Sequence, residues 1–242
     1  MAVEKWMDLN GKVVIVTGGS QGIGEHVVQN LRANNAFVVV ADLRINENFI
    51  EKYGKIDAIV NNAGVSRPRM LVDYYGQKPE YELTEDDLDF MYNVNQKGVV
   101  LCAQAVAREM IKQKSGVIIN LSSQAGIHGS KGQSAYSGTK AAVHSYTMAW
   151  AKELGPFNIR VVGVAPDVNE RTPMNNDAAF EALAYTRGTD PKNTTDDYTK
   201  TIPLGRPGKL DEVADLIAYV VSDHSSYITG TTINISGGKS CN

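Results

Sequence analysis

The chain has little cysteine, little excess charge and no long apolar run. It contains two cysteines, Cys102 and Cys241, which do not make a disulfide framework and suit a reducing compartment. The formal net charge is −3, so the basic surface of a nucleic-acid-binding protein is missing. No apolar run reaches the roughly 18 residues of a membrane span, and the first residues lack a signal-peptide pattern. We therefore expect a cytoplasmic protein with neither a nucleic-acid nor a membrane partner.

The composition is that of a globular protein. Hydrophobic residues make up 43% and charged residues 21% of the 242 residues, so the chain has enough apolar side chains to bury a core. Its length fits a single domain over 1–242. Glycine accounts for 22 of the 242 residues, or about 9%, which exceeds its usual share of about 7%.

Short β-branched runs alternate with helical patterns along the chain. This alternation is typical of a doubly wound, Rossmann-like α/β fold with a parallel sheet. A polar insertion covers about 167–201. The predicted elements are strands at 12–17, 37–41, 56–60, 116–121, 159–165 and 231–235, and helices at about 22–33, 84–114, 134–154 and 210–222.

A glycine-rich turn follows the first predicted strand. Gly18, Gly22 and Gly24 have the spacing G-x-x-x-G-x-G, and a helix comes next. Glycine allows a sharp turn close to a pyrophosphate, and the helix N-terminus offers free N–H groups to it. A tight turn without a ligand would also use glycines, and the strand before and helix after favour dinucleotide binding. The expected phosphate-binding residues are Gly18, Ser20, Gln21, Gly22, Ile23 and Gly24.

Asp42 ends the second predicted strand, 18 residues after Gly24. A carboxylate there accepts hydrogen bonds from the adenosine ribose of NAD and repels the extra phosphate of NADP. Arg44, two residues on, softens this discrimination. The pattern favours NAD as the cofactor, and the alternative is that Asp42 caps the strand.

Tyr136 and Lys140 lie four residues apart at the start of the predicted helix 134–154, so both point to one face. A free tyrosine has a pKa of about 10, too high for a base at neutral pH. We expect the adjacent ammonium to lower the pKa of Tyr136. Ser123 follows the strand 116–121, where its hydroxyl can hydrogen-bond a reacting oxygen.

These motifs together resemble the short-chain dehydrogenase/reductase family. The resemblance implies that Tyr136 is the general acid/base, Ser123 polarises the substrate oxygen, Lys140 binds the nicotinamide ribose and Asn95 holds a relay water. Asn95 as a helix-kink residue and Ser123 as a strand-end cap are the alternatives. The residues that carry the resemblance are Thr17, Gly18, Gly22, Gly24, Asn61, Asn62, Ala63, Gly64, Asn95, Ser123, Tyr136 and Lys140.

The same resemblance extends the cofactor site and the assembly. It implies a homotetramer. Separately, the spacing of the histidines does not suggest a metal site. The further residues expected beside the cofactor are Asn61, Asn62, Ala63, Gly64, Tyr136, Lys140, Pro166 and Thr172.

Segments 181–188, 203–206 and 225–230 resemble the sorbitol-6-phosphate 2-dehydrogenases of this family. The similarity implies a small-molecule substrate, namely a sugar or polyol phosphate. The implied reaction is the oxidation of sorbitol 6-phosphate at C2 to fructose 6-phosphate. One alternative is a reductase of another small carbonyl compound, such as another sugar or a 3-oxoacyl thioester. The other is a catalytically weak NAD-binding regulatory protein.

A sugar phosphate needs cationic partners, and arginine offers bidentate contacts. We expect at least one of Arg69 and Arg187 to bind the phosphate; otherwise they are solvated surface residues. His128 and Lys131 flank the glycine-rich loop after Ser123. The candidate cations are Arg67, Arg69, Lys131, Arg171 and Arg187.

The chain departs from the family pattern at two places. Asp167 follows Pro166 where the family usually has glycine, which puts the path of the loop to Thr172 and the affinity for an anion in question. Only 13 residues, 43–55, separate the second and third strands, too few for the helix, strand and helix expected there. Either the sheet has six strands and lacks one outer strand, or the sequence omits a segment.

Overall fold

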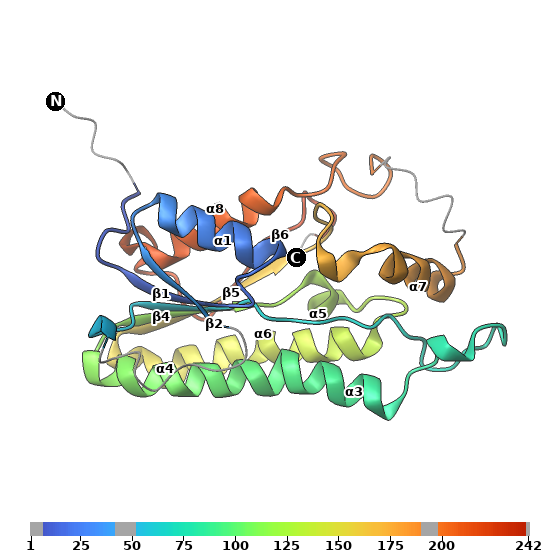
Figure 1. The fold of residues 1–242 in the computed structure, drawn as a ribbon, viewed down its shortest axis with the longest axis horizontal. Coiled ribbons are helices and arrows are strands. Elements are labelled where there is room, and N and C mark those ends of the chain that lie inside the picture. Colours follow the sequence, from blue (N-terminus) through green and yellow to red (C-terminus); the bar gives the residue numbers. More distant parts are fainter. Residues whose placement is uncertain (1–6, 42–51, 190–197, 241–242) are drawn as a thin grey trace.

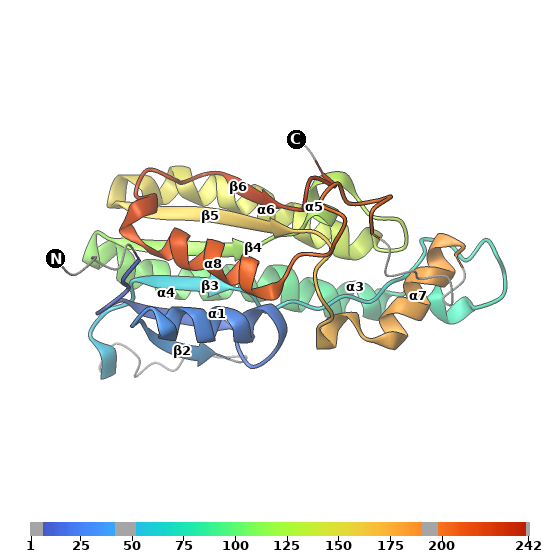
Figure 2. The same ribbon diagram turned by 90° about the horizontal axis from the view of Figure 1, so that it is seen from above.

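The computed structural model describes residues 7–41, 52–189 and 198–240. These ranges form one domain with a six-stranded sheet in the order β2-β1-β3-β4-β5-β6, and each pairing is parallel (Figure 2). The Rossmann-like α/β fold predicted from the alternation is confirmed. The strands are β1 Val13–Thr17, β2 Phe37–Ala41, β3 Ala58–Asn61, β4 Gly116–Leu121, β5 Ile159–Pro166 and β6 Thr232–Ile235.

Helices cover both faces of the sheet (Figure 1). Helices α1 (Gly22–Ala33) and α8 (Leu210–Val221) lie on one face, and α4 (Val99–Gln113) and α6 (Ser134–Leu154) lie on the other. Each face buries its own hydrophobic cluster against these helices. Strands β1, β3 and β4 are buried along their whole length, which explains their continuous runs of apolar residues.

The predicted helix at 84–114 is interrupted. Helix α3 (Glu85–Tyr92) begins at a capping box formed by Thr84 and Asp87, and it continues through a π-helical turn, Asn93–Gly98, into α4. Four short 3₁₀ turns complete the described helical segments. They span Pro79–Tyr81, Gly155–Phe157, Pro173–Asn175 and Asp223–Ser225.

Two helices were not expected from the sequence. Helix α5 (Gln124–His128) follows β4 directly, and α7 (Asp177–Arg187) lies inside the polar insertion. The Asn176 side chain caps α7 by accepting from the Ala179 N–H, and Gly188, with φ +71°, ends it. Within the described ranges, no helix combines the length and apolar character needed to cross a bilayer.

Strand β2 is the edge of the sheet that the structure describes, and it pairs only with β1. Phe37 on this strand is 59% exposed. Asp42, Arg44 and most of the 13-residue connection lie outside the described residues. The described sheet therefore has six strands, and the choice between a shorter protein and an omitted segment stays open.

A buried chain of side-chain hydrogen bonds links the centre of the sheet to α6. Asn61 Nδ2 donates to Asn120 Oδ1 (2.9 Å), Asn120 Nδ2 donates to Thr147 Oγ1 (3.1 Å), and Thr147 Oγ1 donates to the Val143 carbonyl (3.0 Å). Asn61, Asn120 and Thr147 are each at most 2% exposed. Each group in the chain depends on its neighbour because water does not reach it.

Replacing Asn120 with Ala removes the middle of this chain. We expect Asn120→Ala to lower the free energy of unfolding by about 2 kcal/mol or more, since two buried polar groups lose their partners. Asn30→Ala, which removes a surface hydrogen bond to Asp215, should cost less than about 1 kcal/mol. Urea denaturation followed by circular dichroism measures both. Equal losses in the two variants would contradict the assignment.

Candidate active site

Two adjoining cavities open at the carboxyl ends of the strands, where ligands bind in open α/β sheets. The glycine-turn cavity has a volume of about 360 Å³. It is lined by twelve of the residues predicted from sequence: Gly18, Gln21, Gly22, Ile23, Asn62, Ala63, Gly64, Ser123, Tyr136, Lys140, Pro166 and Thr172.

The glycines of the first turn are required by its geometry. Gly18 and Gly22 have φ of +62° and +56°, which only glycine adopts readily. A Cβ at Gly24 would lie 2.2 Å from the Gly18 carbonyl oxygen, so this glycine lets α1 pack closely on the turn. The turn therefore presents backbone to the cavity, as a dinucleotide phosphate needs, and the residues present fit such a cofactor.

Several predicted cofactor residues do not line the cavity. Ser20 and Gly24 are absent from its lining, and Asp42 lies outside the described residues. Asn61 is also absent from this lining, and its expected place beside the cofactor stays a prediction. Its side chain is buried in the sheet and bonds to Asn120 instead, because its position on β3 faces the neighbouring strand's amide.

Asn95 is fully buried in the π-helical turn. Its Oδ1 accepts from the Val65 N–H (2.8 Å), and its Nδ2 donates to the Val65 carbonyl (2.9 Å) and to Thr139 Oγ1 (3.0 Å). The side chain thus joins the α3–α4 helix, the segment after β3 and α6. Its expected role in holding a water stays a prediction, and its place in the helix distortion matches the alternative interpretation.

Ser123, Tyr136 and Lys140 converge from two elements. Ser123 caps α5, with Oγ accepting from the Ala125 N–H (3.2 Å). Tyr136 and Lys140 are buried on the first turns of α6. Lys140 Nζ donates to the carbonyl of Leu121 at the end of β4 (2.6 Å) and lies 5.9 Å from the centroid of the Tyr136 ring. A Cβ at Gly64 would lie 3.4 Å from this Nζ, so the ammonium is held between β4 and the Gly64 backbone.

Burial shifts the pKa of both titrating groups. Burial raises the pKa of Tyr136, against a smaller lowering by its hydrogen bond with the Ser123 hydroxyl. The expectation of a lowered Tyr136 pKa was therefore wrong for this structure: the ammonium is directed at the Leu121 carbonyl, and desolvation dominates. Burial also lowers the pKa of Lys140 to about 8.

The second cavity, about 950 Å³ in volume, is lined by α7, the loop 128–133 and the loop 167–175. We refer to it as the α7 cavity. Ser123 and Tyr136 line it as well as the glycine-turn cavity, so the pair lies where the two cavities meet. Of the predicted substrate residues, those that line it are His128, Arg171 and Arg187.

The remaining candidate cations have other contacts. Arg67 and Arg69 both form ion pairs with Asp87, at 3.2 and 3.0 Å, and line neither cavity. Lys131 Nζ donates to the Arg187 carbonyl (3.3 Å) and is also outside both linings.

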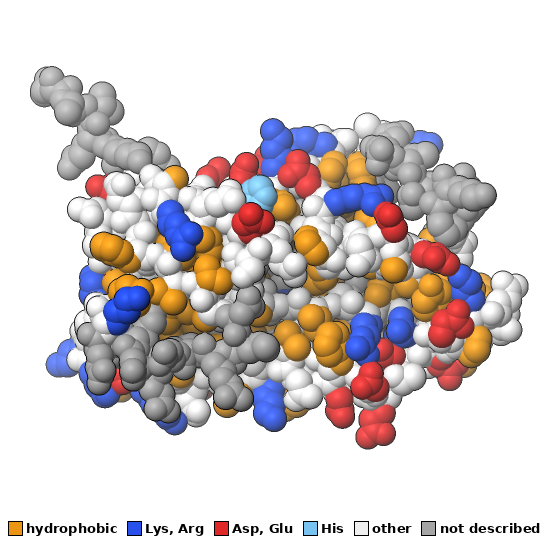
Figure 3. Space-filling model, viewed as in Figure 1, with side chains coloured by type: hydrophobic (Ala, Val, Ile, Leu, Met, Phe, Trp, Pro, Cys, Tyr) orange, Lys and Arg blue, Asp and Glu red, His pale blue; other side chains and the backbone are white. Residues whose placement is uncertain are grey.

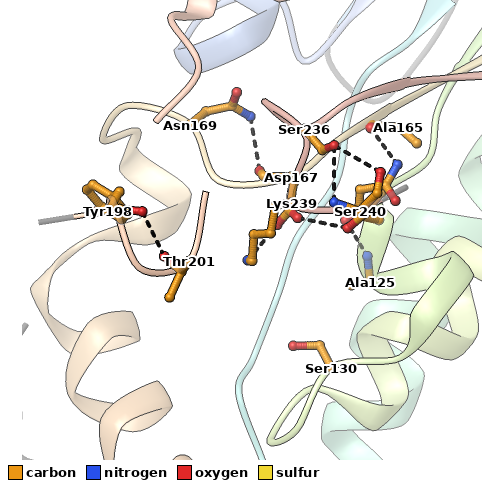
Figure 4. Close-up of polar contacts among 12 residues, drawn as sticks. Ala125, Ser130, Ala165, Asp167, Asn169, Tyr198, Thr201, Ser236, Lys239 and Ser240 are labelled. Atoms are coloured by element: carbon orange, nitrogen blue, oxygen red, sulfur yellow. Dashed lines mark hydrogen bonds and ion pairs between the residues drawn. The ribbon is translucent and has the colours of Figure 1, made fainter. Parts of the chain in front are cut away.

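Asp167 is held by the C-terminal segment rather than facing the cavities with an unpaired charge (Figure 4). Lys239 Nζ lies 3.0 Å from one carboxylate oxygen, and Ser240 Oγ donates to the other (3.2 Å). Asp167 does not have a positive φ, so the usual glycine is not needed there. The loop still brings Thr172 to the glycine-turn cavity, and the ion pair offsets the negative charge.

Sequence reasoning missed other lining residues. Leu121 and Ser122 follow β4 directly and could have been found from the rule that ligands bind at the carboxyl ends of strands. Lys239 and Ser240 line the α7 cavity from the far end of the chain, without a motif to mark them. The other unpredicted lining residues include Val94, Asn169, Met174, Ser130 and Gln133.

Comparison with known proteins identifies the family. The family described as "Enoyl-(Acyl carrier protein) reductase" matches residues 44–240. The chain is 44% identical to the sorbitol-6-phosphate 2-dehydrogenase of Klebsiella pneumoniae, over 97% of this chain and 98% of the relative. The chain is a short-chain dehydrogenase/reductase. This short-chain dehydrogenase/reductase is also 37% identical to the 3-oxoacyl-[acyl-carrier-protein] reductase of Thermotoga maritima, over 96% and 99% of the two chains.

Solved structures of similar fold include nicotinamide-bound enzymes. An NAD⁺-bound xylitol dehydrogenase matches with a TM-score of 0.84 and 26% identity, covering 95% of this chain and 99% of that chain. A 3-ketoacyl-(acyl-carrier-protein) reductase from Brucella melitensis, complexed with NADH, matches with a TM-score of 0.80 and 25% identity, over 97% and 100%. This short-chain dehydrogenase/reductase is therefore an oxidoreductase with the fold of enzymes that bind nicotinamide dinucleotides.

The alignment with the Klebsiella enzyme spans 261 positions, more than the 242 residues of this chain. That relative therefore has residues without a counterpart in this chain.

The buried Lys140 gives the cofactor-free enzyme a pH-dependent stability. Its folded pKa of about 8 lies below the ordinary 10.5, so the unfolded chain binds more protons between these values and stability increases as the pH rises through them. We expect Lys140→Met to remove this increase, whereas Lys152→Met, at an exposed position of the same helix, should keep it. Melting temperatures across this range measure the effect. Parallel curves for wild type and Lys140→Met would refute it.

Proposed function

We propose that this enzyme oxidises sorbitol 6-phosphate at C2 to fructose 6-phosphate with NAD as cofactor. One observation carries the proposal: Ser123 and Tyr136 line both cavities, so a substrate in the α7 cavity and a nicotinamide in the glycine-turn cavity would meet at these two side chains. The 44% identity to a sorbitol-6-phosphate 2-dehydrogenase supports the choice of substrate.

In this proposal each side chain acts on a defined atom. The Tyr136 hydroxyl group, as phenolate, takes the proton of the substrate hydroxyl, and Ser123 Oγ hydrogen-bonds the same oxygen. Lys140 is held by the Leu121 carbonyl beside the Gly64 backbone, where its ammonium can bind the ribose. Bound NAD supplies the acceptor for the hydride from C2. Burial of Tyr136 excludes bulk water from the transferred proton.

The cofactor preference rests on Asp42. Its position after β2 suits a hydrogen bond to the ribose hydroxyls, and its charge opposes a ribose phosphate. The described part of the insertion 167–201 forms one wall of the substrate site in this proposal, because α7 and the loop 167–175 line the second cavity. As the family resemblance implies, we further propose a cytoplasmic homotetramer.

The first test uses Tyr136. We expect Tyr136→Phe to lower kcat for sorbitol 6-phosphate by about 10²–10⁴-fold, the usual contribution of a positioned acid or base. Tyr146→Phe, on the same helix with its hydroxyl bonded to Gln96, should leave kcat within about twofold. Absorbance of NADH follows both reactions with a panel of polyols, polyol phosphates and a 3-oxoacyl thioester.

The panel separates the competing functions. Turnover of free sorbitol alone, or of the thioester alone, would refute the polyol-phosphate assignment. NAD binding without turnover of any compound would favour the regulatory alternative.

The second test uses Asp42. Removing the carboxylate deletes a charged hydrogen bond and a repulsion, so we expect Asp42→Ala to shift the ratio of kcat/KM for NAD over NADP by at least about tenfold toward NADP. Asp89→Ala, at an exposed position of α3, is the control. An unchanged ratio in Asp42→Ala would show that another group selects the cofactor.

A further inference from the structure

Arg187 stands apart from the other cations near the α7 cavity. It is the last residue of α7 and lines this cavity together with Ser123 and Tyr136. Its guanidinium donates to Ser130 Oγ (3.2 Å) and, at 3.5 Å, to Gln133 Oε1 and the Lys131 carbonyl. Within residues 7–41, 52–189 and 198–240, no carboxylate forms an ion pair with it.

The neighbouring cations are already neutralised. Arg171 pairs with Asp177, and Lys239 pairs with Asp167 at 3.0 Å. Arg69, the other candidate from the sequence, pairs with Asp87 and lies outside the lining. Charged side chains of both signs gather at this end of the molecule (Figure 3). Among the described arginines and lysines that line this cavity, Arg187 is therefore the one without an acidic partner.

Arg187 is held in place by both of the segments beside it. Tyr185 Oη donates to Asp73 Oδ1 (2.7 Å), and Lys78 Nζ pairs with Glu181 (2.7 Å), so α7 is tied to the segment between β3 and α3. On the other side, a Cβ at Gly132 would lie 2.1 Å from Thr186 Oγ1. The loop 128–133 therefore packs closely under the end of α7.

The same loop connects Arg187 to the reacting groups. Helix α5 begins after Ser123 and ends at His128, and the loop then carries Ser130 and Gln133 to the start of α6, close to Tyr136. One continuous wall of the cavity thus holds the reacting groups and the arginine. Desolvation lowers the pKa of Arg187 and Asp167 raises it, and a guanidinium stays charged in either case.

We propose that Arg187, with the Ser130 hydroxyl beside it, binds the phosphate monoester of the substrate. This inference rests on the proposed function and adds the group that selects a phosphorylated polyol over a free one. The phosphate lies at the end of the polyol chain opposite the reacting C2, which matches an anion site removed from Ser123 and Tyr136. The planar guanidinium offers two parallel donors to phosphate oxygens.

The test compares Arg187→Met with Arg69→Met. We expect Arg187→Met to lower kcat/KM for sorbitol 6-phosphate by about 10–100-fold, which is the value of charged hydrogen bonds. For free sorbitol, which the wild type uses with a lower kcat/KM, the variant should stay within about twofold of the wild type. Arg187→Lys should recover part of the loss. Arg69→Met, checked for folding by circular dichroism, should retain the wild-type preference. The proposal would be overturned if Arg187→Met lowered kcat/KM equally for both substrates. It would also be overturned if Arg69→Met lost as much of the preference for sorbitol 6-phosphate over free sorbitol as Arg187→Met does.

Calorimetric binding of sorbitol 6-phosphate separates this inference from the proposed function. One outcome is that the wild type binds sorbitol 6-phosphate without oxidising it and that Arg187→Met binds it more weakly. This outcome would support the phosphate site and refute the proposed reaction. Oxidation by the wild type with unchanged binding and kinetics in Arg187→Met would refute the phosphate site alone.

Discussion

The hydrogen bond from Lys140 Nζ to the Leu121 carbonyl joins the start of α6 to the carboxyl end of β4. It holds a buried ammonium beside the Gly64 backbone, and it fixes the helix that also carries Tyr136. Because β4 runs directly into Ser123, the same junction sets the serine opposite the tyrosine. The meeting point of the two cavities depends on this contact between one strand end and one helix.

The two sides of this junction are built differently. On the glycine-turn side, backbone is exposed by glycines whose φ or close contacts exclude other residues. On the α7 side, side chains from distant segments make the surface, and their charges are largely paired within the protein. A backbone cradle suits the invariant phosphates of a dinucleotide, whereas a side-chain surface can be adapted to one substrate. Asp167 illustrates the second case, because Lys239 and Ser240 compensate its charge.

Much of the fold and half of the site could be predicted from local patterns. Strand and helix alternation predicted the sheet, and the four-residue spacing predicted that Tyr136 and Lys140 share a helix face. The sequence did not reveal α7, because its cap and its terminal glycine lie within a polar stretch that lacks a strong apolar period. The motif did not reveal that the Asn61 side chain bonds to Asn120 within the sheet while its neighbours in the motif line the glycine-turn cavity.

The sequence by itself determined the glycine turn, the alternation of strands and helices of an α/β sheet and the pairing of Tyr136 with Lys140, since each depends on residues close together in the chain. Only the tertiary structure decided that Arg187 remains without an acidic partner among the described residues while Arg69 is paired with Asp87, and that burial raises the pKa of Tyr136. Ion pairing and desolvation arise from groups brought together across long stretches of chain. A pattern within a short stretch of sequence therefore does not reveal ion pairing or desolvation.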